Sequence, residues 1–149
     1  MFKTARVFTI AAIFTVLICF NALANTWTPI NDELDIDYKE SIIQIFIIGF
    51  KKHDNTKALN DAAVRTYAYI CSLPYGKGGG RLGAELKKRP ALDAKVKSII
   101  SREVSARPNV KHDYPDWTKI EDGTLTAYLY FPLKKLLSVL PDLQIPEKE

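Results

Sequence analysis

The sequence has few of the residues from which catalytic and metal sites are usually built. Its 149 residues include two cysteines and two histidines, and Cys19, His53, Cys71 and His112 are well separated along the chain. Their spacing matches no standard zinc site, which needs several such ligands close together. No serine lies in the Gly-x-Ser-x-Gly turn that presents the nucleophile of many hydrolases. The sequence therefore predicts no enzymatic activity, no cofactor and no bound metal.

The chain also lacks a large excess of charge of either sign. It has 21 Lys and Arg residues against 17 Asp and Glu residues, a formal net charge of +4, and loss of Lys3 and Arg6 with a leader would reduce this to +2. Such a small excess argues against a dedicated nucleic-acid-binding protein. The distribution is uneven, because residues 81–107 hold eight basic and three acidic residues, whereas residues 25–61 hold four basic and seven acidic residues. One basic face and separately solvated helices both fit this pattern.

The N-terminus has the features of a secretory signal peptide. A short basic segment precedes the apolar run 7–20, and Ala22-Leu23-Ala24 ends in the small-residue pattern that signal peptidase cleaves. The apolar run is shorter than the roughly 20 residues of a membrane span, so we expect no stable membrane insertion. The chain also lacks an Asn-x-Ser/Thr acceptor for glycosylation. The sequence predicts cleavage of residues 1–24, export to a bacterial periplasm and a single domain over residues 25–149.

The periodicity of apolar residues predicts a mainly α fold, a small antiparallel bundle of about four helices. Residues 33–52 are assigned to a central helix, because acidic residues begin the segment and basic residues end it. Residues 55–73 repeat apolar side chains at helical spacing, and a third helix is expected to begin at Pro90. Residues 124–140 are assigned to the last helix, with a kink at Pro132.

Two of these segments fit strands as well as helices. Five isoleucines lie between Ser41 and Gly49, a composition typical of a buried strand. Apolar and polar residues alternate over residues 124–131, as in a half-buried strand. The alternative to the bundle is therefore an α+β fold with strands near 42–50 and 124–131.

The segment CSLPYGKGGGRLG, residues 71–83, holds five of the seven glycines. Gly78, Gly80 and Gly83 match the letters of a dinucleotide-binding fingerprint, but that motif must follow a strand and this segment follows a predicted helix. The segment is therefore interpreted as a flexible connection between helices. Cleavage would remove the other cysteine, so Cys71 is expected to be an unpaired thiol buried at the end of a helix.

Two irregular connections are predicted to form a partner-binding surface. One is the glycine-rich segment and the other is an aromatic segment over residues 112–120. Tyrosine, tryptophan and arginine dominate the energetics of protein interfaces. The residues chosen on this basis are Tyr75, Lys77, Arg81, His112, Tyr114 and Trp117. The predicted function is protein binding, and the alternative is a small envelope enzyme or envelope-associated protein that uses Cys71 or the segment 112–120.

Several features together carry a family resemblance. They are the predicted signal peptide, the short predicted helical domain, Asp37-Tyr38, the pattern Ala-x-x-x-Tyr-x-Tyr-Ile-Cys ending at Cys71, and the leucine-rich segment 125–140. In this plan the chain resembles the periplasmic immunity proteins that neutralise peptidoglycan-amidase effectors of type VI secretion. The resemblance implies an all-helical protein, often a homodimer, that inserts a loop into the active-site cleft of a toxic cell-wall hydrolase. The cysteine that this family carries in its closing segment has no counterpart after Cys71, so no functional residue is transferred.

Overall fold

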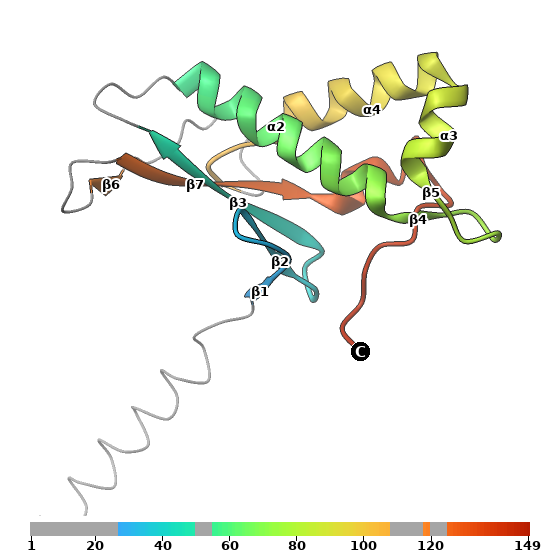
Figure 1. Ribbon diagram of the computed structural model, residues 1–149, viewed down its shortest axis with the longest axis horizontal. Helices are drawn as coiled ribbons and strands as arrows, with labels where there is room; N and C mark the ends of the chain where they lie inside the picture. The colour runs from blue at the N-terminus through green and yellow to red at the C-terminus, as the bar shows by residue number, and fades with distance from the viewer. Residues whose placement is uncertain (1–26, 50–54, 108–117, 120–124) are drawn as a thin grey trace, which may run out of the picture.

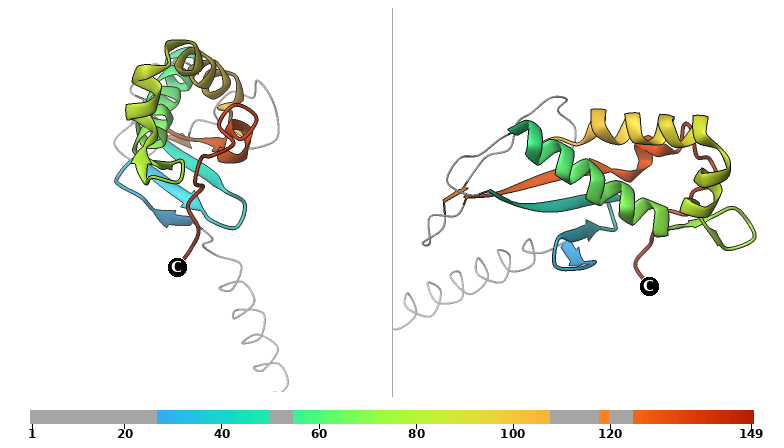
Figure 2. Two further views of the ribbon diagram at one scale, coloured as in Figure 1. Left: turned by 90° about the vertical axis from the view of Figure 1, so that its right-hand side faces the viewer. Right: turned by 45° about the horizontal axis from the view of Figure 1, so that its top comes forward.

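A computed structural model describes residues 27–49, 55–107, 118–119 and 125–149 (Figure 1). This part of the chain forms an antiparallel sheet of order β1-β2-β3-β7-β6, with the helices on one side of it (Figure 2). The strands of the sheet are β1 (Trp27–Pro29), β2 (Leu34–Asp37), β3 (Ile42–Gly49), β6 (Thr118–Lys119) and β7 (Leu125–Pro132). The other elements are α2 (Asn55–Ser72), the small hairpin of β4 (Pro74–Tyr75) and β5 (Gly80–Arg81), α3 (Leu82–Lys88), α4 (Pro90–Glu103) and the 3-10 turn η1 (Leu133–Leu136).

Strands β3 and β7 form the centre of the sheet. They pair over eight residues each, from Ile42 opposite Pro132 to Gly49 opposite Leu125. Successive side chains of a strand point to opposite faces, so every second residue faces the helices. The helix-facing side chains of both strands are almost fully buried. They are Ile43, Ile45, Ile47, Ala127, Leu129 and Phe131.

Helices α2 and α4 cover this buried face and contact each other (Figure 1). The buried side of α2 consists of small residues at helical spacing, among them Ala58, Ala62 and Thr66, followed by Ile70. Small side chains allow the helix backbone to approach the β-branched surface of the sheet closely. Helix α4 begins with Pro90 as its first residue, as predicted, because proline fixes a helical φ and needs no amide donor there.

The predicted helical bundle is wrong, and the alternative α+β fold describes the structure. Residues 33–52 contain strands β2 and β3, joined by a turn in which the Asp37 carboxylate accepts hydrogen bonds from the backbone N–H groups of Lys39 and Glu40 at 3.0 and 3.3 Å. Ser41 then adopts a positive φ of 58°, which a continuous helix does not permit. The isoleucine run follows as a strand, because β-branched side chains pack well on a pleated surface.

The last predicted helix is also wrong in its first half. Residues 125–132 are strand β7, and only η1 is helical in the leucine-rich segment that follows. The helices predicted over 55–73 and from Pro90 are confirmed, with bounds Asn55–Ser72 and Pro90–Glu103. The predicted signal peptide lies outside the described residues. Among the residues that are described, no helix is both long and apolar enough to cross a membrane.

One polar atom in the core has no hydrogen-bond partner, and this gives a stability prediction. The Thr66 hydroxyl is fully buried on α2 and makes no hydrogen bond. An unpaired buried hydroxyl costs about 1 to 3 kcal/mol. We expect Thr66→Val to raise the free energy of unfolding by about 1 kcal/mol, measured as a higher urea midpoint with an unchanged m value. Thr66→Ser keeps the hydroxyl and loses a methyl group, so it should lower the midpoint. A lower midpoint for Thr66→Val would show that the hydroxyl is bonded.

Candidate protein-binding site

The face of the sheet opposite the helices carries several apolar and aromatic side chains, and no described helix lies on it (Figure 2). The second set of alternating residues in β3 and β7 points to this side, and Ile48 and Tyr128 are 53% and 48% exposed. Strand β1 adds Trp27 at the far edge. We call this surface the uncovered sheet face. Its residues include Trp27, Gln44, Phe46, Ile48, Thr126, Tyr128 and Tyr130.

The aromatic side chains of the uncovered sheet face hold one another in place. The rings of Phe46 and Tyr128, opposite each other in the β3–β7 ladder, have centroids 5.4 Å apart. The rings of Trp27 and Tyr130 are 5.8 Å apart, and the Gln44 amide donates a hydrogen bond of 3.0 Å to the Tyr130 hydroxyl. Such tilted pairs stabilise each other beyond the area they bury. The face therefore presents rings in a fixed arrangement.

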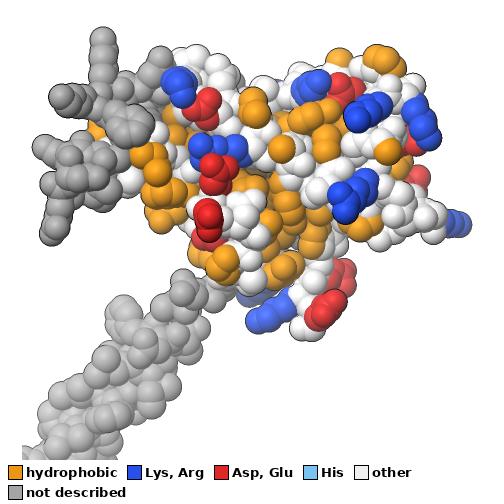
Figure 3. Space-filling model, viewed as in Figure 1, with side chains coloured by type: hydrophobic (Ala, Val, Ile, Leu, Met, Phe, Trp, Pro, Cys, Tyr) orange, Lys and Arg blue, Asp and Glu red, His pale blue; other side chains and the backbone are white. Residues whose placement is uncertain are grey.

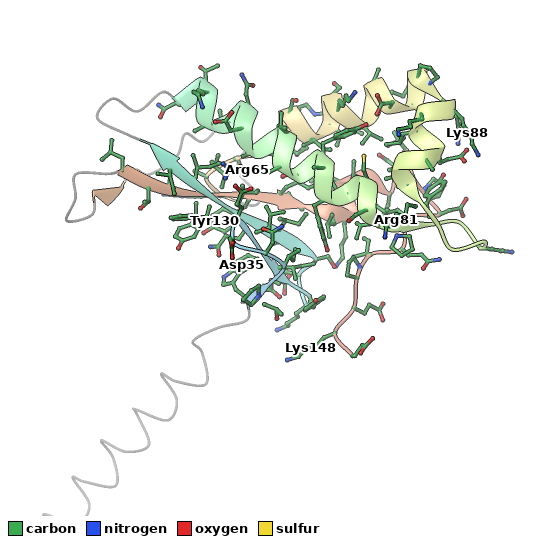
Figure 4. All side chains as sticks on the ribbon, in the orientation of Figure 1. Asp35, Arg65, Arg81, Lys88, Tyr130 and Lys148 are labelled. Atoms are coloured by element: carbon green, nitrogen blue, oxygen red, sulfur yellow. The ribbon has the colours of Figure 1, made fainter. Side chains whose placement is uncertain are left out.

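A shallow hollow of about 200 Å³ lies at one end of this face. It is lined by Asp32, Glu33, Leu34, Asp35, Gln44, Phe46 and Tyr128. The aromatic residues Phe46 and Tyr128 line one part of it, the chain that leads into β2 supplies the carboxylates of Asp32 and Glu33, and β2 itself supplies that of Asp35. Asp35 and Tyr130 lie on the side of the sheet away from α2 (Figure 4). On the face of the molecule seen in Figure 3, apolar side chains lie between acidic and basic ones.

Arg65 of α2 closes the edge of β3 beside the hollow. Its guanidinium donates a hydrogen bond of 2.7 Å to the Phe46 carbonyl and lies 3.4 Å from the Glu33 carboxylate. Within the described part of the chain, Asp32 and Asp35 have no such counter-charge: neither side chain forms a hydrogen bond or an ion pair. The hollow therefore carries negative charge that Arg65 only partly balances.

Three of the residues predicted as binding residues lie together, but away from this face. Tyr75, Lys77 and Arg81 belong to the β4–β5 hairpin, where Tyr75 pairs with Gly80 and the two basic side chains are exposed. The hairpin replaces the predicted flexible connection, and Gly76 and Gly79 are needed in its turn because their φ angles are +72° and +69°. The other three predicted residues, His112, Tyr114 and Trp117, lie outside the described residues.

The C-terminal segment holds this hairpin against the body of the protein. The Gly76 amide donates to the Asp142 carbonyl at 3.1 Å, and the Gln144 amide donates to the Pro74 carbonyl at 3.2 Å. The Gln144 side chain donates a further hydrogen bond of 3.0 Å to the Gly76 carbonyl. The glycines therefore belong to a hairpin that hydrogen bonds hold in place, not to a flexible connection.

Cys71 is a half-buried free thiol at the end of α2. The start of α3 lies so close that a Cβ atom on Gly83 would be 3.1 Å from both the Cβ and the carbonyl oxygen of Cys71. The absence of a side chain at Gly83 thus permits the close packing of α3 against the end of α2. This packing accounts for the last glycine of the segment that matches a dinucleotide-binding fingerprint only in its letters. Among the described residues, no group of three or more His, Cys, Asp and Glu side chains is placed to hold a metal ion.

A coupled group of tyrosine, carboxylate and ammonium side chains joins helices α2 and α4, away from the uncovered sheet face. The Tyr67 hydroxyl donates to the Asp93 carboxylate, which lies 2.8 Å from the Lys97 ammonium. This hydrogen bond, with burial and a smaller effect of Cys71, raises the pKa of Tyr67. Hydrogen bonds from Lys97 and Tyr67 lower the pKa of Asp93. The three groups satisfy one another and join two helices, as structural ties do.

Comparisons of the chain with models of protein families, with curated protein sequences and with solved structures found no match. The candidate site therefore rests on geometry. Sequence reasoning missed it because Phe46 was placed inside a helix and Tyr128 in an ambiguous segment. The available signal was the alternation of Thr126, Tyr128 and Tyr130 with apolar residues, which marks the outer face of a strand.

The tie between α2 and α4 predicts a specific dependence of stability on alkaline pH. The pKa of Tyr67 is higher in the folded state than its usual value of about 10, so its contribution is complete below that pH and is lost as pH rises further. We expect Tyr67→Phe to lower the free energy of unfolding by about 1 kcal/mol at pH 7. The variant should also lose part of the decline above pH 10, measured by urea unfolding between pH 7 and 11. An unchanged alkaline decline would show that another group causes it.

Proposed function

We propose that this protein is a protein-binding module that holds its partner on the uncovered sheet face. The observation that carries the proposal is the two tilted aromatic pairs, Trp27 with Tyr130 and Phe46 with Tyr128, on a sheet face without a covering described helix. Aromatic residues are enriched at the centres of protein interfaces, where they contribute most of the binding free energy.

The composition of this face favours binding over simple solvation. Antiparallel sheets often leave one face in water, but the residues on that face are then mostly polar. Here Phe46, Ile48 and Tyr128 occupy neighbouring outward positions on the two central strands. Because these strands also carry the core, the rings are presented on a rigid support, and a partner would lose little free energy in ordering them.

The partner predicted from the sequence is a toxic cell-wall hydrolase that the protein meets in the periplasm, and we retain it as the specific form of this proposal. The resemblance that suggested it implied an all-helical fold with an inserted loop, and the α+β fold corrects that implication. In our proposal the sheet face takes the part that the loop was expected to play. The protein needs no catalysis of its own for such a role.

Capture of the partner tests this function. The full chain with a C-terminal tag would be expressed in its own source, and co-purifying proteins would be identified by mass spectrometry. We expect one stoichiometric partner, and we expect Tyr128→Ala to weaken its binding about tenfold or more, because loss of a central aromatic side chain typically costs over 1 kcal/mol.

The matched control is Val64→Ala, since Val64 is 68% exposed on α2, away from the uncovered sheet face. It should leave capture unchanged. Equal losses for the two variants, or a partner that is retained fully by Tyr128→Ala, would count against this face as the binding site.

A further inference from the structure

The hollow at the end of the uncovered sheet face has a chemistry of its own. Its volume of about 200 Å³ is below the roughly 300 to 1,000 Å³ of pockets that enclose small-molecule ligands. It is open on the same side as the exposed ring of Tyr128, so a partner on that face would cover it. A hollow of this size suits one protruding side chain.

The charge of the hollow determines which side chain fits. Asp32, Glu33 and Asp35 contribute carboxylates, whereas none of the described residues that line it is basic. Arg65, which comes from α2 on the other side of the sheet, pairs with Glu33 alone among these three. An acidic partner side chain would be repelled, and an apolar one would leave Asp32 and Asp35 partly desolvated without a counter-charge. A cationic side chain avoids the repulsion and supplies the counter-charge that Asp32 and Asp35 lack.

The aromatic wall favours the same choice. Phe46 and Tyr128 present rings beside the carboxylates, and their centroids are 5.4 Å apart. Guanidinium and ammonium groups are attracted to ring faces, and the long aliphatic stems of Arg and Lys pack along apolar surface. An aromatic wall with carboxylates at its rim thus complements both parts of a long basic side chain.

We propose that the hollow receives an arginine or lysine side chain that the partner protein presents to the uncovered sheet face. The inference rests on the proposed function and names the chemistry of the partner surface. The partner carries a protruding basic residue within an otherwise apolar contact area. Opposite charges at the rim give such a contact its orientation and its rate of encounter more than its affinity.

A model side chain tests the hollow without the partner. The probe is N-acetyl-arginine methylamide, titrated into the ¹⁵N-labelled full chain, with the citrulline analogue as the uncharged control of the same shape. We expect saturable shifts of the amide signals of Gln44, Phe46 and Tyr128 with the arginine probe alone. Shifts of equal size with the citrulline analogue, or none with either, would overturn the inference.

Matched variants separate the contributions of charge and rings. Asp32→Asn with Asp35→Asn should weaken the probe about threefold or more, as expected for two exposed ion pairs. The control Asp142→Asn with Glu147→Gln removes two carboxylates from the exposed C-terminal segment and should leave probe binding unchanged. Tyr128→Leu should weaken binding, whereas Tyr128→Phe keeps the ring and should not. Equal effects of the two double variants would show that net charge alone attracts the probe, and would contradict the inference.

The two proposals fail in different ways. A captured partner whose binding is insensitive to Asp32→Asn with Asp35→Asn would overturn the role of the hollow and leave the protein-binding function standing. Binding of the probe by a protein that captures no partner would overturn the protein-binding function. Lys77 and Arg81 are exposed basic residues of the β4–β5 hairpin, so a second copy of this chain could also supply the basic side chain. Self-association in sedimentation that is lost in the double variant Lys77→Gln with Arg81→Gln would show that the second copy occupies the hollow. That result would overturn the proposed partner.

Discussion

The pairing of β3 with β7 is the constraint on which the rest of the structure depends. These strands are far apart in the sequence, yet they pair along their whole length and form the centre of the sheet. Their register decides which residues face the helices, because a shift by one residue would turn every side chain to the other face. Ile45 opposite Leu129 and Ile43 opposite Phe131 fill the core only in the observed register. The helices then add the second layer.

The same register builds the candidate site. Phe46 meets Tyr128, and Gln44 meets Tyr130, because these residues alternate with the buried ones along the same two strands. Strand β2 pairs with β3 only as far as Ile45, and beyond this point Arg65 binds the Phe46 carbonyl. An unpaired strand edge invites pairing with other chains, and a charged side chain on it prevents this. Strands β3 and β7 therefore carry both the buried core residues and the exposed residues of the candidate site.

How much of this follows from the sequence depends on whether the deciding contacts are local. Helix α4 was predictable, because Pro90 and the spacing of Val96 and Ile100 are local signals. The sequence did not decide whether the residues of β3 form a strand or a helix. Acidic residues before β3 and basic residues after it are typical of the two ends of a helix, and its partner strand β7 lies far along the chain. The predicted Tyr75, Lys77 and Arg81 do share one hairpin. The aromatic face was missed because only strand pairing brings it together.

An exposed aromatic face without other features would bind many apolar surfaces, so specificity must come from what surrounds it. The carboxylates of Asp32 and Asp35 have no counter-charge among the described residues. A partner that buried them without supplying a cation would remove their hydration, and no new interaction would offset that cost. In the proposed complex, that penalty would act against partners that bring no cation, because specificity can come from a cost against the wrong partner as well as from a contact with the right one. Arg65 pairs with Glu33 and, among the described residues, with neither Asp32 nor Asp35, so the carboxylates without a counter-charge are the two beside the aromatic rings. In the proposed complex, the apolar area of the uncovered sheet face would supply the affinity, and the hollow would supply the selection between partners.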